Sequence, residues 1–172
     1  MFLGGLKAKS ILRKLKKETE SRIYSPSGQP VRRIGILQDE NHAFDPKKIK
    51  PLATVFGIQE KDVTILSYVP KLPKERKEET NVYSEKGIGW NGTLKTPSLK
   101  EFVQKDFDLL LSYYSEDRLP LRLVSGLSKA TFKVGLIRDE ESFQDLVITT
   151  AIGEETLFID ELEKYLQILK II

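Results

Sequence analysis

The chain has 172 residues, with 28 Lys or Arg against 25 Asp or Glu, one histidine and no cysteine. This is the length of one ordinary domain, and 40% apolar and 31% charged residues are values of a globular protein. Without cysteine there is no disulfide or thiolate chemistry, and a single histidine disfavours a transition-metal site. No apolar run approaches the roughly 20 residues of a membrane span. We therefore expect a cytoplasmic protein without a transmembrane segment, metal or cofactor.

The N-terminal segment carries the excess positive charge, since residues 1–22 hold seven Lys or Arg and two Glu. Ala8, Ile11, Leu12 and Leu15 recur at helical spacing within residues 2–17. Cations fill most other positions, and we expect them to contact an anionic partner: Lys7, Lys9, Arg13, Lys14, Lys16 and Lys17. The pattern predicts a basic amphipathic helical arm over residues 1–24, a turn or linker at Ser25–Pro30, and a single α/β domain over residues 31–172.

The segment after the linker alternates strands with helices. A strand at Val31–Leu37, a helix at Pro46–Phe56 and a strand at Val63–Tyr68 arrive within about 40 residues, the length of a βαβ unit with parallel strands. The charged stretch Pro70–Asn81 is expected to form an exposed loop, followed by a short edge strand at Asn81–Ser84.

The second half repeats this alternation. Thr96 and Pro97 open a helix that runs to about Lys105. The segment Phe107–Tyr114 contains three consecutive leucines, which is typical of a strand buried on both faces of a parallel sheet. The remaining elements are a helix at Pro120–Lys129, strands at Thr131–Leu136 and Leu146–Thr150, and a helix from about Thr156. Together they predict a three-layer α/β fold, with a mostly parallel (Rossmann-like or flavodoxin-like) sheet, helices on both faces, and the basic helix in front.

The last helix is more apolar than one face requires. We expect it to bury one face, consisting of Phe158, Leu162, Tyr165, Leu166 and Leu169. The other apolar residues are Leu157, Ile159, Ile168, Ile171 and Ile172. Because exposed apolar side chains favour aggregation, we expect this excess to be covered either by the N-terminal helix or by a second copy in a homodimer.

The stretch GIGWNG, residues 87–92, has the G-x-G-x-x-G spacing of a dinucleotide-binding loop. Such a loop follows a strand directly and leads straight into a helix, whereas this stretch follows a charged loop and is separated from the next helix. We therefore expect a glycine-rich loop, with Trp90 either packed down as its anchor or forming a binding surface with Asn91.

Two polar loops follow predicted parallel strands, whose carboxyl ends are the usual place for ligands. The stretch DENHAFD includes His42, which is either a general base or a solvated histidine, and Asp45, a candidate helix cap. The stretch YYSEDR either lines a crevice or forms an ordinary loop before a helix. No catalytic set is complete. The candidate ligand crevice comprises Asp39, Glu40, His42, Trp90, Asn91, Tyr113, Tyr114 and Asp117.

Two resemblances accompany these patterns. The stretch from Phe107 to Leu136 is similar to the N-terminal half of heptosyltransferase-like glycosyltransferases, which implies an α/β sheet. The family's glycine-aspartate pair after the first strand is replaced here by Gln38-Asp39-Glu40-Asn41. The whole chain resembles a family of short bacterial proteins known only as a domain of unknown function. The residues that carry this likeness are Glu40–Asp45, Phe107–Tyr114, Phe132–Gly135 and Glu161–Leu166.

These observations favour a non-catalytic binding or assembly protein whose basic helix contacts an anionic macromolecule, either RNA or an acidic protein. A small enzyme or ligand-binding domain with a crevice at the carboxyl edge of the sheet, like half of a glycosyltransferase, is the alternative.

Overall fold

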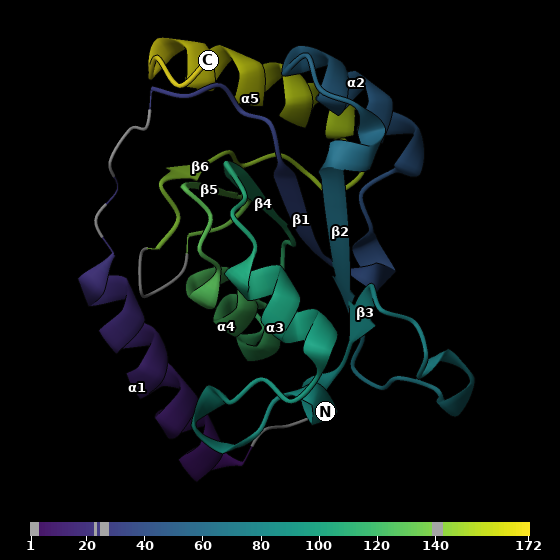
Figure 1. Ribbon diagram of the computed structural model, residues 1–172, viewed down its shortest axis with the longest axis vertical. Helices are drawn as coiled ribbons and strands as arrows, with labels where there is room; N and C mark the ends of the chain where they lie inside the picture. The colour runs from purple at the N-terminus through teal and green to yellow at the C-terminus, as the bar shows by residue number, and fades with distance from the viewer. Residues whose placement is uncertain (1–3, 23, 25–27, 139–142) are drawn as a thin grey trace.

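The computed structural model describes residues 4–22, 24, 28–138 and 143–172. Over these residues the chain forms one six-stranded sheet in which every pair of neighbouring strands is parallel, with helices on both faces (Figure 1). The predicted, mostly parallel α/β fold is confirmed.

The strand order is β3-β2-β1-β4-β5-β6, so the direction in which strands are added reverses between β1 and β4. These two strands are buried along their whole length, as expected at the centre of a covered sheet. The strands are β1 Ile34–Asp39, β2 Val63–Tyr68, β3 Val82–Tyr83, β4 Leu109–Tyr113, β5 Phe132–Gly135 and β6 Leu146–Val147. The predicted central strand, Phe107–Tyr114, thus contains β4.

Each face of the sheet has its own apolar core. The α-helices are α1 Gly5–Ser21, α2 Ile49–Val55, α3 Pro97–Gln104, α4 Leu119–Leu127 and α5 Glu155–Ile168. Helices α2 and α5 pack on one face, where Leu52 and Phe158 join the core. Helices α1, α3 and α4 pack on the other, where Leu15, Phe102 and Leu121 join the second core.

The boundaries of some elements differ from the predicted ones. β1 begins three residues later than predicted, because the N–H groups of Arg32 and Arg33 donate to the Asp108 carboxylate at 2.8 and 2.9 Å. Helix α1 ends at Ser21, within the predicted arm of residues 1–24. Phe2 and Leu3 at the predicted helix start, and residues 25–27 of the predicted linker, lie outside the described residues.

Helix α5 buries a face rotated from the predicted one. The buried side chains are Phe158, Ile159, Leu162 and Leu166, whereas Tyr165 and Leu169 are 37% and 50% exposed. Three residues of the expected excess are exposed: Leu157, Ile168 and Ile172. Because α1 packs on the opposite face of the sheet, it does not cover them. A homodimer through this helix stays a prediction.

Helix α1 docks on the body through two fully buried side chains, Ile11 and Leu15. It lies against α4 and the loop around Trp90–Gly92, as seen at the lower left of Figure 1. The close approach depends on Gly126 of α4, because a Cβ atom there would overlap Leu15 Cδ2. The apolar stripe predicted from the sequence is thus used against protein.

Replacing Gly126 with alanine tests this contact. We expect Gly126→Ala to lower the free energy of unfolding by about 1–3 kcal/mol, because the new methyl group must displace Leu15 in a packed core. Adding Leu15→Ala should cost less in this background than in the wild type. Urea unfolding of the four proteins measures the coupling. Gly5→Ala, where the added Cβ meets open space, is the control; additive effects at positions 126 and 15 would contradict the contact.

Candidate functional site

The carboxyl ends of β1 and β4 bring two predicted loops together. Asp39, the last residue of β1, is 3% exposed. Its Oδ1 accepts a hydrogen bond from the Asn41 N–H at 3.0 Å, which caps a short 3-10 turn at Glu40–His42. Its Oδ2 lies 3.4 Å from Arg118 Nε, in the loop after β4. The loops therefore meet at one edge of the sheet, as a site between them requires.

Three residues that the sequence analysis missed complete a buried polar cluster at this edge. Tyr68 ends β2, Tyr83 ends β3, and Glu85 follows two residues later; all three are at most 5% exposed. Burial and the Glu85 carboxylate, which accepts a hydrogen bond from the hydroxyl, raise the pKa of Tyr68 to about 12. The Tyr83 hydroxyl donates to the Pro120 carbonyl oxygen at 2.9 Å. We call Asp39, Tyr68, Tyr83, Glu85, Tyr114 and Arg118 the edge cluster.

Tyr113 and Tyr114 do not share one crevice, because successive residues of a strand point to opposite faces. Tyr114 is buried on the α4 face, with the edge cluster. Tyr113 is buried on the α5 face, where its hydroxyl donates to Glu155 Oε1 at 3.0 Å and accepts from the Gly153 N–H at 3.2 Å. Burial raises the pKa of Tyr113 to about 12. Tyr113 thus ties β4 to the start of α5.

The other predicted crevice residues lie at the rim of this edge. Glu40 accepts two hydrogen bonds from Arg76, at 2.7 and 2.5 Å, and these bonds lower its pKa. Asp117, which precedes α4, pairs with Arg122 of that helix, and the N-cap residue of α4 is Arg118. His42 is exposed. Over the described residues, no three His, Cys, Asp or Glu side chains are grouped to hold a metal ion.

The glycine-rich loop does not resemble a phosphate-binding turn, because helix α3 begins only at Pro97. Its anchors are Ile88 and Leu94, which pair as an antiparallel bridge and are 0% and 8% exposed. Trp90 is 62% exposed, so of its two predicted roles it is not the packed anchor of the loop. It sits in a tight turn with Asn91 in the left-handed region at φ 61°.

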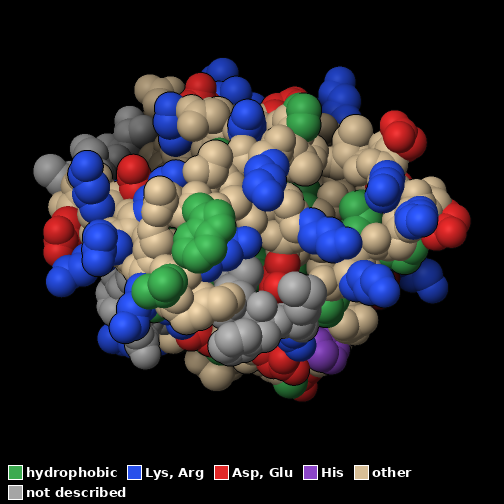
Figure 2. All heavy atoms as spheres, turned by 90° about the horizontal axis from the view of Figure 1, so that it is seen from below, with side chains coloured by type: hydrophobic (Ala, Val, Ile, Leu, Met, Phe, Trp, Pro, Cys, Tyr) green, Lys and Arg blue, Asp and Glu red, His purple; other side chains and the backbone are tan. Residues whose placement is uncertain are grey.

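Helix α1 holds this loop in place with polar contacts. Lys7 Nζ donates to the Ile88 carbonyl oxygen at 2.7 Å, Lys14 Nζ lies 3.4 Å from the Gly92 carbonyl oxygen, and Ser10 Oγ bonds Asn91 Oδ1. The other four predicted contact residues are exposed: Lys9, Arg13, Lys16 and Lys17. Figure 2, which looks onto the carboxyl edge of the sheet, shows Lys and Arg side chains around exposed apolar side chains on this side of the molecule.

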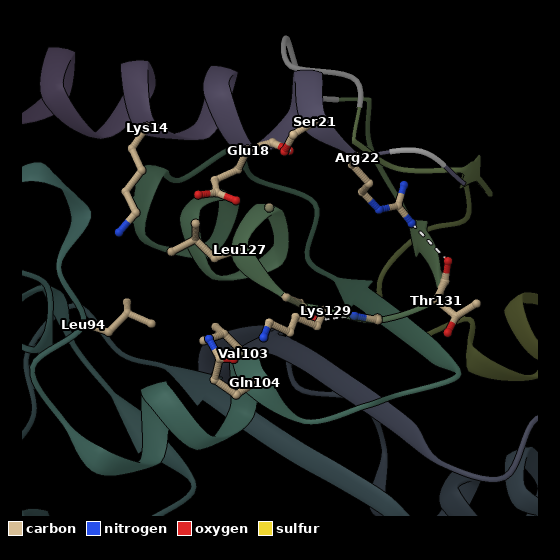
Figure 3. Close-up of a pocket in the computed structure, with 13 residues that line it drawn as sticks. Lys14, Glu18, Ser21, Arg22, Leu94, Val103, Gln104, Leu127, Lys129 and Thr131 are labelled. Carbon is tan, nitrogen blue, oxygen red and sulfur yellow. Dashed lines mark hydrogen bonds between the residues drawn. The ribbon is translucent and has the colours of Figure 1, made fainter. Parts of the chain in front are cut away.

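A cavity of about 660 Å³ lies beside α1, away from the carboxyl edge (Figure 3). Its walls come from α1 and from the ends of α3 and α4. Lys14 and Glu18 point toward it from α1, and Lys129 faces them across a floor that includes Leu94, Val103 and Leu127. Arg22 closes one end, where it pairs with Asp145 at 2.6 Å and donates to the Thr131 carbonyl oxygen at 3.2 Å. Lys14 is the one predicted contact residue that lines this cavity.

The fold and these sites define an α/β protein with a parallel sheet and a docked basic helix. Over the described residues, no helix has both the length and the apolar character needed to cross a bilayer. The chain belongs to DUF6913, a family of unknown function, which it matches over residues 7–169. Comparison with curated proteins and with solved structures gave no match. The predicted membership in a domain family of unknown function is confirmed, and the match spans most of α1 as well as the sheet.

The raised pKa of Tyr68 predicts how stability depends on alkaline pH. In the unfolded chain tyrosine ionises near 10.0, whereas in the fold this requires a pH of about 12. The stability contributed by the neutral hydroxyl is therefore complete below pH 10 and lost as the pH rises toward 12. Urea unfolding between about pH 9 and pH 12 should show a shallower loss in Tyr68→Phe than in the wild type. Tyr165→Phe, at an exposed tyrosine, is the control; equal pH dependence in all three proteins would count against this environment of Tyr68.

Proposed function

We propose that this protein is a non-catalytic binding protein whose basic helix α1 contacts single-stranded RNA. The observation that carries the proposal is the exposed Trp90, which is held next to the cations of α1 by the contacts between Ser10 and Asn91 and between Lys7 and the Ile88 carbonyl. An exposed indole beside Lys and Arg side chains is the combination that stacks on bases and neutralises phosphates.

The docking of α1 determines which cations are available. Because Ile11 and Leu15 face the body, Lys9, Arg13, Lys16 and Lys17 face solvent. Lys16 lies 4.0 Å from Glu20, but both side chains are largely exposed, so this pair is weak and leaves the lysine accessible. Four accessible cations on one helix favour a partner with regularly spaced negative charge.

The side of α1 next to Trp90 continues the same surface. Leu6, Ser10, Arg13 and Lys17 recur at i, i+4, i+7 and i+11, so they form one strip along the helix. Ser10 fixes this strip beside the Trp90 loop. A single-stranded RNA that stacks a base on Trp90 can therefore place its phosphates next to Arg13 and Lys17, which lie in the same strip. Lys14 and Lys129 in the adjacent cavity extend the positive charge.

A nucleic acid fits this surface better than a membrane does. A helix that lies in a bilayer interface needs a continuous apolar stripe facing the lipid. Here the central stripe residues, Ile11 and Leu15, are buried by docking, and among the described residues the exposed large apolar side chains near α1 are Leu6 and Trp90. The carboxylates of Asp39 and Glu40 are engaged with Arg118 and Arg76, which favours binding over acid–base catalysis at that edge.

The test is salt-dependent RNA binding by a variant without the exposed cations. Changing Lys9, Arg13, Lys16 and Lys17 to Gln should reduce the magnitude of the slope of log binding constant against log salt by up to about 3, because each phosphate contact on a single strand contributes about 0.7. Fluorescence anisotropy of a labelled single-stranded RNA measures the slope. The control variant changes four exposed lysines elsewhere, namely Lys47, Lys50, Lys61 and Lys77, to Gln.

The same assay separates the alternatives. Equal loss of slope in both variants would mean attraction by net charge alone and would contradict a site on α1. Displacement of the RNA by polyglutamate at equal charge concentration would favour an acidic protein as the partner. Binding to anionic vesicles in preference to RNA would overturn the choice of nucleic acid.

A further inference from the structure

The edge cluster lies where a parallel sheet is best placed to bind a ligand. The strand order reverses between β1 and β4, and at such a reversal the loops after the two strands diverge and leave a crevice beyond their carboxyl ends. Asp39 is the last residue of β1, and Tyr114 and Arg118 follow β4. The cluster lies on the face of the sheet that α4 covers, whereas Tyr113 contacts α5 on the other face.

The cluster contains more buried negative charge than positive charge. Asp39 and Glu85 are 3% and 5% exposed, whereas Arg118 is partly exposed and its terminal nitrogen also pairs with Glu116 at 2.7 Å. Of these two buried carboxylates, Asp39 is the one that lies next to the guanidinium, 3.4 Å from Arg118 Nε. Burying an unbalanced carboxylate is costly, so a second cation near Glu85 would lower the free energy of the folded state.

Two polar atoms of the cluster are left without hydrogen bonds. Glu85 Oε2 is buried and finds no hydrogen-bond partner among the residues that the structure describes. The Tyr68 hydroxyl interacts with the same carboxylate, and this interaction contributes to the raised pKa of Tyr68. Arg118 Nε is likewise buried, and its 3.4 Å approach to Asp39 lacks hydrogen-bond geometry. Buried polar groups in native proteins are almost always paired, so an orphaned carboxylate oxygen at this edge indicates a missing donor.

We propose that the edge cluster binds a small organic ammonium ion, whose N–H group donates to Glu85 Oε2. The ammonium charge balances the second buried carboxylate. The rings of Tyr68 and Tyr83, whose centroids are 5.4 Å apart, belong to the same buried cluster, and aromatic rings attract such a cation. This binding is separate from the RNA contact of α1 and uses none of its residues.

Other ligand chemistries fit the cluster less well. A hard metal ion takes six or more oxygen ligands, whereas the cluster offers two carboxylates, one of which already contacts Arg118. An anion would meet the carboxylates of Asp39 and Glu85 at short range. A neutral alcohol satisfies the orphaned oxygen but leaves the charge imbalance in place, so it serves as the comparison ligand in the test.

The experiment measures thermal unfolding with n-butylammonium, 1,4-diaminobutane and tetramethylammonium chlorides, each compared with sodium chloride at equal ionic strength, and with 1-butanol as the neutral analogue. We expect at least one primary amine to raise Tm by about 3–6 °C when present at about ten times its dissociation constant. Tetramethylammonium and 1-butanol should not, because the first has no N–H donor and the second no charge. Glu85→Gln should abolish the shift, while Glu101→Gln at an exposed position of α3 should preserve it.

Amide chemical shifts of the wild-type protein locate the site without a substitution. The amine should perturb residues around Asp39, Glu85 and Arg118 and leave α1 unchanged. Equal stabilisation of Glu85→Gln, shifts spread over the surface, or no response to any primary amine would each overturn the proposal. The RNA-binding experiment changes other residues and measures RNA affinity. The outcome of the amine experiment therefore neither supports nor contradicts the proposed RNA binding.

Discussion

The packing of α1 on α4 at Gly126 is the constraint on which the proposed function depends. With no side chain at position 126, Leu15 lies fully buried against α4, and this fixes the rotation of α1 about its own axis. The rotation in turn determines which cations face solvent and places Lys7 and Ser10 on the loop that carries Trp90. A different rotation would bury lysines and separate the basic surface from the indole. The arm is therefore part of the folded surface, and its charge is held in a defined geometry.

The sheet likewise determines which polar side chains lie next to one another. Parallel pairing brings the ends of β1, β2, β3 and β4 to one edge, so side chains far apart in sequence become neighbours. On one face of this edge Tyr113 binds Glu155 and completes a structural network. On the other face the edge cluster keeps an orphaned carboxylate oxygen. Two buried polar groups at one edge thus differ in whether their hydrogen bonds are satisfied, and this difference is the basis for proposing a ligand at the edge cluster.

The sequence predicted the features that local pattern determines. Three consecutive leucines identified the central strand, and the spacing of Ile11 and Leu15 identified the face of α1 that docks. The sequence left Trp90 open between an anchor and a binding surface, because the interior of its loop is filled by Ile88 and Leu94, whose pairing is a tertiary contact. For α5, apolar residues lie all round the helix, so only the sheet selects which are buried. Tyr68, Tyr83 and Glu85 emerge as a cluster only once the register of β2 and β3 is known.

The fluorescence of Trp90 tests the central claim most directly, since it is the chain's single tryptophan and is 62% exposed. Stacking of a base on the indole should quench its emission as single-stranded RNA is added, with saturation at the stoichiometry seen by anisotropy and reversal as salt is raised. Quenching in step with binding would support an RNA contact between Trp90 and α1. Unchanged emission while the RNA is bound, or no binding at low salt, would contradict the account.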